Sequence, residues 1–467
     1  MPNRMFSPGR IPAALAAALL LLCATAAMAA TPVTFWTTEV SRDRRAVIDY
    51  LAKVFMLFNP DVQVYVAGID ENELVGVMEQ ARLERQGPDV VGCASNLVVA
   101  FCNRGWVDNA ATARVIDAVG RDRFYRGALD RVSLEKGKTC GIPFNGWIQG
   151  IWYRKDWFEE AGLAPPDNWA AILKAAKTLH DPAHGRYGIL VGTRDDVYAE
   201  QIFTHLALSE GVREFTPDGK VAFDSPATVR TLKFYAELAK YTPPGQQWWR
   251  GRDFYLQGKL AMMFYSTFIM DDLALSGVAA DSLTGANFTE LTGAAYDYEL
   301  PDRTGMVSRL TGTRTASYGV LHALGLLRNR DKARSEAAQR FVRFLFREDA
   351  YLTWLHMVPG GMLPVLRDVT ADPAFYRDAQ GVFHRYPRQR LEAILKGFDS
   401  LQSFEFEDGK LIPAAAKVSS KGVIGGMIRE VLDGKATPEQ AVREAAERMR
   451  AIAVETPDDW LDGISKQ

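Results

Sequence analysis

Val33-Thr34-Phe35-Trp36-Thr37 opens the stretch that decides the fold, and Asp61-Val62-Gln63-Val64-Tyr65-Val66 and Asp89-Val90-Val91 complete it. All three runs are rich in β-branched and aromatic residues, as buried strands are. Between them, residues 43–58 carry apolar side chains at helical spacing, and residues 71–85 form a second helix-like stretch. Strand, helix, strand, helix and strand in this order predict an α/β open sheet with parallel neighbours.

Polar residues follow two of these predicted strands. Thr38 and Glu39 come directly after the first strand, and Ser95 and Asn96 come just past the third. In open α/β sheets, ligands bind beyond the carboxyl ends of the strands. The sequence therefore places these four residues at the rim of a candidate binding site.

The middle of the chain breaks this alternating pattern. Ile142-Pro143-Phe144-Asn145-Gly146-Trp147 is turn-rich but aromatic, and it runs into a strand from Ile148 to Tyr153. We interpret Ile142–Trp147 as a crossing between two lobes. Thr311-Gly312-Thr313-Arg314 precedes another strand, Tyr318 to His322, and is a second candidate crossing. The irregular passage through Gly360-Gly361 marks a third.

Several later elements have clear boundary signals. Lys259 to Phe264 is an apolar, strand-like run, and Ser266-Thr267-Phe268 follows at its carboxyl end. A helix that begins near Trp169 can be capped by Asp167 or Asn168. The last helix starts with Thr437-Pro438-Glu439-Gln440, a capping box with proline at the first helical position.

The 467-residue chain has an ordinary globular composition, with 48% hydrophobic and 24% charged residues. Its length suggests two or more domains, each large enough to bury a core. Lysine and arginine number 55 against 57 acidic residues, which gives a formal charge of −2. A chain without a basic surplus has little to hold a phosphate backbone, so dedicated nucleic-acid binding is disfavoured.

Residues 1–29 are interpreted as a cleavable secretory signal peptide. Two arginines form a basic start, an apolar run from Ile11 to Leu22 follows, and Ala27-Met28-Ala29 fits the small-x-small cleavage pattern. The apolar run is shorter than the roughly 20 residues of a membrane span. An uncleaved anchor and lipidation at Cys23 are the alternatives. We therefore expect a protein exported to the periplasm.

Three cysteines follow the predicted signal peptide, namely Cys93, Cys102 and Cys140. An oxidising compartment permits a disulfide, and Cys93–Cys102 is the simplest pair. The odd count leaves one thiol over. Three buried free thiols are the alternative to a bridge.

The sequence carries no recognisable catalytic motif. A nucleophile elbow, a zinc-protease histidine pair, a phosphate loop and a dinucleotide-binding turn are all missing. His180 and His184 have the spacing of a helical metal site, but Pro182 and Gly185 put them in a loop. Acidic pairs such as Asp195-Asp196 are expected on solvated faces rather than in a glycosidase dyad. We therefore expect no enzyme activity, no metal and no cofactor.

Aromatic residues gather near turns and strand ends. The chain has 10 Trp, 16 Tyr and 24 Phe. Those at strand ends or in loops include Trp36, Trp147, Trp248, Trp249 and Phe268. Aromatic rings stack on the apolar face of a sugar ring while nearby polar groups take its hydroxyls, as in small-molecule clefts. This pattern favours a cleft for a sugar, and a core or interface role for each ring is the alternative.

Taken together, these segments resemble the family-1 extracellular solute-binding proteins of bacterial ABC importers. The blocks that carry the resemblance are, in order, Val33–Trp36, Gly87–Val91, Ile142–Asn145, Ile151–Leu163, Pro166–Trp169, Gly258–Met262 and the run 339–364. Each block alone is modestly specific, whereas their common order spans nearly the whole mature chain.

The resemblance implies a two-lobe periplasmic binding protein fold of type II, with an α/β sheet flanked by helices in each lobe and three hinge crossings. It places residues 30–142 and 315–358 in lobe 1, and residues 143–314 and 359–467 in lobe 2. A ligand would be trapped between the lobes as they close about the hinge. The protein would act as a monomer and deliver this ligand to the permease subunits of the importer.

The resemblance also implies ligand contacts when it is carried over residue by residue. They are Thr38, Glu39, Asn96, Asn145, Trp147, Ser266, Phe268, Arg314 and Gly361, and the loop residue Trp248 joins them as an aromatic candidate. Two departures from the family pattern leave the ligand open. Cys93 stands where an apolar or aromatic residue is common, and Thr311–Arg314 replaces a frequent double glycine.

The predicted ligand is a sugar or oligosaccharide, and a glycerol phosphate or other small anion is the alternative. Glu39 would accept hydrogen bonds from hydroxyl groups. Arg314 could hydrogen-bond a neutral sugar or hold a carboxylate or phosphate in bidentate fashion, and a salt bridge in the hinge is its other interpretation. An exported enzyme that acts on glycans is a third hypothesis.

Overall fold

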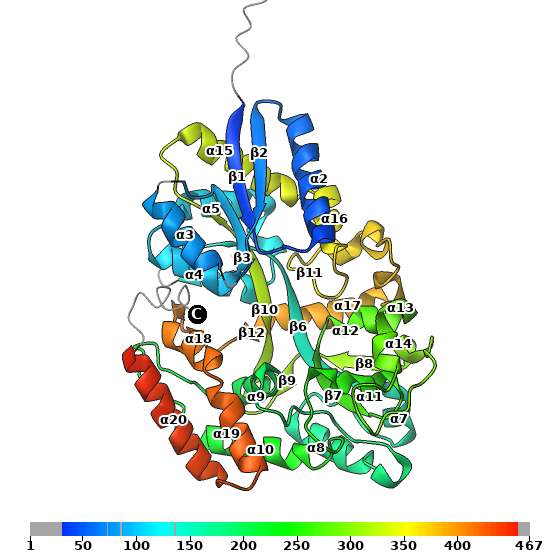
Figure 1. Ribbon diagram of the computed structural model, residues 1–467. Coiled ribbons are helices and arrows are strands. Elements are labelled where there is room, and N and C mark those ends of the chain that lie inside the picture. Colours follow the sequence, from blue (N-terminus) through cyan, green and yellow to red (C-terminus); the bar gives the residue numbers. More distant parts are fainter. Residues whose placement is uncertain (1–29, 72, 85, 135–136, 456–467) are drawn as a thin grey trace, which may run out of the picture.

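The computed structural model describes residues 30–71, 73–84, 86–134 and 137–455 (Figure 1). The predicted signal peptide, residues 1–29, lies outside the described residues. Among the described helices, none is both long enough and apolar enough to cross a membrane.

The N-terminal strands form the predicted parallel sheet. β1 (Thr31–Thr37) lies between β2 (Val62–Gly68) and β3 (Val90–Ala94), and both neighbours are parallel to it. Inward-facing side chains such as Val33 and Phe35 are fully buried. The two connecting helices are α2 (Arg42–Phe58) and α3 (Leu74–Leu83), as the apolar spacing predicts. The alternation of strands and helices is therefore confirmed.

Two long antiparallel strands join the two halves of the molecule, and Figure 1 shows them side by side along its centre. β6 (Ile142–Arg154) and β10 (Thr315–Leu326) pair with each other near their middles. At one end β10 pairs with β3, and at the other end β6 pairs with β7 (Met262–Ser266) and β8 (Thr304–Val307). One ten-stranded sheet thus runs through both halves.

The sequence predicts three separate crossings, and the structure places three neighbouring strands there. β11 (Leu363–Pro364), just after Gly361, pairs with β6 at Asn145 and Gly146. The first crossing is not a turn-rich segment but part of the continuous strand β6. The second crossing is part of β10 and not Thr311–Arg314. Those four residues form the hairpin between β9 (Leu310–Thr311) and β10.

Glycines allow β6 and β10 to approach each other closely at the crossing. A Cβ atom on Gly319 would lie 2.2 Å from the carbonyl oxygen of Trp147, and one on Gly146 would lie 2.5 Å from that of Val320. Cβ atoms are not found so close to backbone oxygens, so any larger residue would push the strands apart. This close approach explains why a glycine-containing run forms a strand rather than a turn.

The remaining elements cover the two halves of the sheet. The upper half in Figure 1 contains β1–β3 and the following helices, in addition to α2 and α3: α4 (Ser95–Asn103), α5 (Asn109–Val119), α6 (Arg126–Asp130), α15 (Lys332–Leu345) and α16 (Glu348–Leu355). The lower half contains β7–β9 and the following helices: α7 (Lys155–Glu160), α8 (Trp169–Thr178), α9 (Val197–Ser209), α10 (Pro226–Ala239), α11 (Arg252–Leu256), α12 (Ile269–Ala274), α13 (Ser276–Ala279), α14 (Leu300–Arg303), α18 (Pro413–Ser420), α19 (Val423–Leu432) and α20 (Pro438–Glu455). α17 (Arg388–Leu395) and the two-residue strands complete the set: β4 (Ser133–Leu134), β5 (Lys138–Thr139), β12 (Leu401–Gln402), β13 (Phe406–Glu407) and β14 (Lys410–Leu411).

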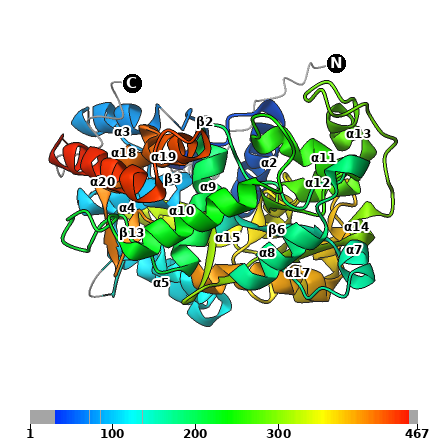
Figure 2. The same cartoon turned by 90° about the horizontal axis from the view of Figure 1, so that it is seen from below.

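Local capping signals are confirmed at two helices. Asn168 caps α8, because its side chain accepts a hydrogen bond from the backbone amide of Ala171. Thr437 and Gln440 form the reciprocal capping box of α20, with distances of 3.0 and 3.3 Å. The C-terminal helices α19 and α20 then pack beside α9 and α10 at the base of the lower half (Figure 2).

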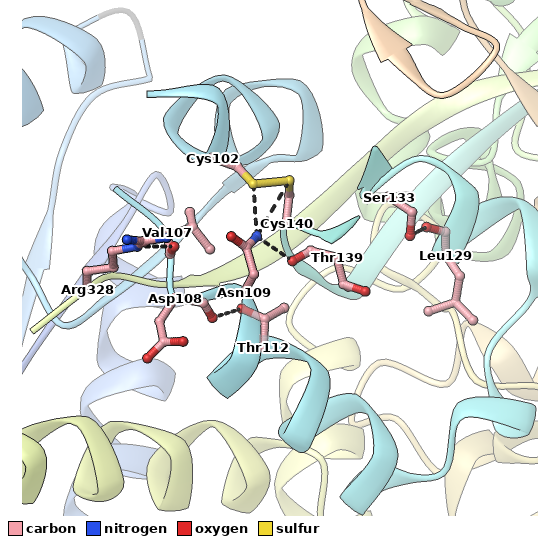
Figure 3. The surroundings of a disulfide bond; sticks show 10 residues. All are labelled: Cys102, Val107, Asp108, Asn109, Thr112, Leu129, Ser133, Thr139, Cys140 and Arg328. Carbon is pink, nitrogen blue, oxygen red and sulfur yellow. Dashed lines mark hydrogen bonds between the residues drawn. A yellow bond between two sulfur atoms is a disulfide. The ribbon is translucent and has the colours of Figure 1, made fainter. Parts of the chain in front are cut away.

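The disulfide differs from the predicted pair. Cys102, near the end of α4, is bonded to Cys140 (Figure 3). Cys93 is a buried free cysteine in β3. The Asn109 amide lies between the bond and the chain before β6, and it donates to the Thr139 carbonyl at 2.8 Å. Cys93–Cys102 is wrong because β3 holds the Cys93 side chain within the core, whereas α4 carries Cys102 away towards the start of β6.

Candidate ligand-binding site

A cavity of about 380 Å³ lies where the upper half, the crossing strands and the lower half meet. The start of α4 lines it from the upper half, the middles of β6 and β10 form its back, and α9 and α18 line it from the lower half. Its lining residues are Glu71, Ala94, Ser95, Asn96, Arg131, Trp147, Glu200, Thr204, Glu214, Tyr318, Gly319, Val320, Leu321, His322, Ser403, Phe404, Glu405, Ala415 and Ser419.

Two of the predicted contact residues line this cavity. β3 ends at Ala94 and α4 begins at Ser95, so Asn96 stands at the carboxyl end of a parallel strand, where the topology predicts a ligand. Trp147 projects from β6 at the crossing, and its ring meets Tyr318 of β10 edge to face, with centroids 6.2 Å apart. The cavity thus has an aromatic wall beside a polar rim.

Four glutamates line the cavity, namely Glu71 and three that come from later parts of the chain. Glu200 comes from α9, Glu214 from the turn after α9, and Glu405 from the segment between β12 and β13. Glu200 is 9% exposed and Glu214 only 3%. Burial raises the pKa of all three carboxyls, and for Glu214 the neighbouring Glu200 and Glu405 raise the pKa further.

The three carboxyl groups differ in their hydrogen bonds. Ser419 donates to Glu200, and the Asn96 amide donates to Glu405. Oε2 of Glu214 is buried and has no hydrogen-bond partner. Burying an acceptor without a hydrogen-bond partner costs free energy, so Glu214 is the cavity group that would be stabilised most by a hydrogen-bond donor on a ligand.

Arg131 is the arginine of the cavity wall. It follows α6, is 8% exposed, and donates from Nη1 to the Ser403 hydroxyl at 2.5 Å. Its guanidinium lies 5.5 Å from the centre of the Phe406 ring, and Glu405 is close enough to raise its pKa, although burial lowers that pKa overall. Arg131 is therefore already engaged with the segment that carries Glu405.

Five other predicted contacts lie outside the cavity lining. Glu39 is 7% exposed, and its carboxylate is paired with Arg44 at 2.7 Å, next to Thr38. Ser266 ends β7 opposite Gln149. Phe268 lies against Gly361, where a Cβ atom would be 2.2 Å from its ring.

The last three predicted contacts are also placed elsewhere. Asn145 is buried in β6 and pairs with β10 and β11. Trp248 packs edge-on against Trp249, and Arg194 lies 5.5 Å from its ring centre. Arg314 donates from Nε to the Leu208 carbonyl at 2.8 Å, at the carboxyl end of α9. That contact occupies the guanidinium away from the cavity.

Sequence reasoning missed the residues that give the cavity its charge. For Glu200 a signal was available, because it stands in α9, where most side chains are buried and apolar. A glutamate inside such a helix indicates a special environment. Glu214, Glu405 and Arg131 gave no comparable signal, because they sit in short or irregular segments that reach the cavity only through tertiary packing.

The two histidines whose spacing matches a helical metal site each contact a different residue. His180 contacts the Tyr241 carbonyl at 3.1 Å, and His184 contacts Asp181 at 2.6 Å. Within the described ranges, no group of three or more His, Cys, Asp or Glu side chains is arranged to hold a metal ion.

Comparisons with known proteins agree with this architecture. Residues 40–351 match the model of the family described as bacterial extracellular solute-binding protein. A relative from Escherichia coli K12, named as the putative ABC transporter periplasmic-binding protein YcjN, is 30% identical over 86% of this chain and 88% of its own length.

Solved structures show the same fold. The sugar-binding protein MalE from Xanthomonas citri aligns with a TM-score of 0.70 at 18% identity, over 91% of this chain and 98% of its own. An ABC transporter solute-binding protein from Thermotoga lettingae, solved with tagatose, aligns with a TM-score of 0.61 at 21% identity, over 91% of this chain and all of its own. The two-lobe, type II fold predicted from the sequence is therefore confirmed. The chain belongs to the family of bacterial extracellular solute-binding proteins.

Proposed function

We propose that this protein is the periplasmic solute-binding component of an ABC importer. It captures a sugar or oligosaccharide between its two lobes and delivers it to the membrane permease. The observation that carries this proposal is the cavity, which the start of α4, the crossing strands and α9 line together. The sugar ligands of similar binding proteins, such as tagatose, support the same class of ligand.

The lining of the cavity suits a polyhydroxylated ligand. The half-buried ring of Trp147, with Tyr318 beside it, offers an apolar face for the C–H groups of a sugar ring. Glu200, Glu214 and Glu405 offer carboxylate oxygens for hydroxyl donors. Among the predicted contacts, Asn96 and Trp147 are the two that we retain as ligand-binding residues.

Closure would follow from contacts to both lobes. A ligand shifts the equilibrium towards the closed state only when it binds that state more tightly than the open one. Asn96 stands on the upper side of the cavity, whereas Glu200 and Glu214 stand on the lower side. The neighbouring strands β6, β10 and β11 form the connection about which the lobes would turn.

The charge of the cavity argues against the alternative ligand, a glycerol phosphate or other small anion. Four glutamates and one arginine are among the residues that line the cavity, and Arg131 is already engaged with Ser403. Arg314, the predicted anion contact, points its guanidinium at the end of α9 instead. An anion would therefore add repulsion to a site that already carries excess acid.

The remaining parts of the proposal follow from the family. The protein would be exported by its signal peptide and would act as a monomer that binds its ligand without chemical turnover. It would need no cofactor, metal or nucleic acid, and its protein partners would be the permease subunits.

Thermal denaturation with a panel of ligands tests this function. The mature chain is mixed with monosaccharides, oligosaccharides, polyols and glycerol 3-phosphate. A ligand at about 1,000 times its dissociation constant adds about 4 kcal/mol to the stability of the folded state. We expect a rise with one class of saccharide or polyol. A rise with glycerol 3-phosphate alone, or turnover of a glycan, would contradict the proposal.

The variant Trp147→Ala tests the site itself. Removing this aromatic wall is expected to weaken binding of the identified saccharide by at least tenfold, or about 1.5 kcal/mol, as for a buried aromatic anchor. Trp249→Ala is the matched control, because Trp249 is 39% exposed and lies outside the cavity. Equal affinities of the two variants would remove Trp147 from the site.

A further inference from the structure

The lining of the cavity contains more carboxyl groups than basic groups. Glu200 and Glu214 are almost completely buried, and Glu405 lines the same cavity. Arg131 is the arginine of the cavity lining, yet its position over Phe406 and its hydrogen bond to Ser403 place it beside the segment that carries Glu405. Glu214 therefore has two acidic neighbours and no cationic partner among the described residues.

Glu214 also has an incomplete set of hydrogen bonds. Its Oε2 atom is buried without a partner, in a side chain that lines the cavity and is only 3% exposed. A buried carboxylate needs both hydrogen-bond donors and an opposite charge, and leaving either unmet costs free energy. Among the described residues, no side chain donates a hydrogen bond to this Oε2 atom or forms an ion pair with Glu214, and the cavity beside it has room for a ligand that would do both.

A neutral sugar would meet only half of this need. Its hydroxyl groups donate hydrogen bonds to carboxyl groups, but they bring no opposite charge that would favour the ionised form of these groups. An ammonium group donates up to three hydrogen bonds and carries the opposite charge as well. The faces of Trp147 and Tyr318 in the same cavity favour a cation further, because aromatic rings attract positive charge.

We propose that the natural ligand of this cavity is a saccharide or polyol that carries a protonated amino group, with the ammonium seated beside Glu214 and Glu200. This inference rests on the proposed function and narrows its ligand class. The hydroxyl groups of the same ligand would reach Asn96 and Glu405.

Isothermal titration calorimetry of the mature chain at about pH 7 tests the inference. The ligands are glucosamine, galactosamine, mannosamine and short chitosan oligomers, each compared with its neutral parent sugar and its N-acetylated form. Acetylation keeps the hydroxyl groups and removes the charge but adds an acetyl group, so the neutral parent sugar, with a hydroxyl in place of the amine, is the control for size. We expect at least one amine to bind ten times more tightly than both of its uncharged counterparts.

Variants assign the preference to the acidic groups. Glu214→Gln is expected to abolish the preference for the amine, and Glu200→Gln is a second variant in case the first unfolds. Glu430→Gln is the matched control, because Glu430 also has a buried carboxyl oxygen without a partner but lies in α19, outside the cavity lining. The control is expected to retain the full preference.

The possible results separate this inference from the proposed function. If neutral sugars bind as tightly as the amines, the inference fails and the proposed function stands. If cyclohexylamine, an amine without hydroxyl groups, binds as tightly as the amino sugars, the site recognises a simple cation and the saccharide part of the inference fails. If no sugar of either kind binds, both are overturned.

Discussion

Breaking the Cys102–Cys140 disulfide should destabilise the protein by a calculable amount. The bond closes a loop with a sequence separation of 38 residues, which includes α5 and α6. In the chain-entropy model, the stabilisation contains a constant and a term in the logarithm of loop length. For this loop the sum is about 4 kcal/mol at 25 °C.

The double variant Cys102→Ala/Cys140→Ala is the perturbation of choice. Alanine brings no polar group of its own, although it removes the Cys102 sulfur, which accepts a hydrogen bond from the Asn109 amide at 3.1 Å. The hydrogen bond from Asn109 to the Thr139 carbonyl, 2.8 Å long, does not depend on either sulfur and can persist. We therefore expect the loss to reflect mainly the freed loop of the unfolded chain.

Urea denaturation with and without a reductant measures this loss. The wild-type midpoint should fall on reduction to that of the double variant, and the variant should not respond to the reductant. Cys93→Ala is the control, because Cys93 is buried and free, so its variant should respond to reduction as the wild type does. A wild-type midpoint that does not change with the reductant, or a disulfide-linked peptide containing Cys93, would refute the Cys102–Cys140 assignment.

Three further predictions concern the cavity and the crossing strands. Burial raises the pKa of Glu214 far above its unfolded value, so the folded state holds this proton more strongly and loses stability as pH rises above about 4.5. Glu214→Gln should therefore gain stability relative to wild type between about pH 5 and pH 8. Urea midpoints of the two proteins measure this gain, and a difference that stays constant with pH would contradict it. Gly319→Ala should lower the free energy of unfolding by about 1–3 kcal/mol or more, because its Cβ would lie 2.2 Å from the Trp147 carbonyl oxygen. Gly277→Ala, with open space around it, should leave the midpoint of the same denaturation assay unchanged. Asp196→Ala removes the side chain that caps α9 by accepting from Ala199 at 3.0 Å and should cost about 1 kcal/mol of unfolding free energy, an expectation that an unchanged midpoint would reject.

Much of the fold could be predicted because its signals are local. The apolar alternation around Phe35 and Val64 marks the strands, and the side chains of Asn168 and Thr437 mark helix starts, since a cap acts on amides two or three residues away. The order of the strands and helices then restricts the topology to a parallel sheet with a binding rim at its carboxyl edge. The predicted topology places Asn96 at that edge, and Asn96 lines the cavity.

The charged part of the cavity could not be predicted in the same way. Glu214 and Glu405 are nearly 200 positions apart in the sequence, and each lies in a short connection without a periodic pattern. Their proximity arises only when the chain after β12 returns to the start of α4 and the end of α6. Arg314 is the opposite case. Its position at a predicted crossing indicated a ligand contact, but its side chain donates a hydrogen bond to the carboxyl end of α9.

The class of fold, the family and the place of the first crossing could be recognised from the sequence, because they depend on short-range periodicity and on motifs in a characteristic order. The tertiary structure alone decided the disulfide partner of Cys140, the continuity of β6 through the crossing and the acidic wall of the cavity. The physical reason is that pairing, burial and charge compensation depend on distances in space, and segments far apart in the chain acquire those distances only on folding.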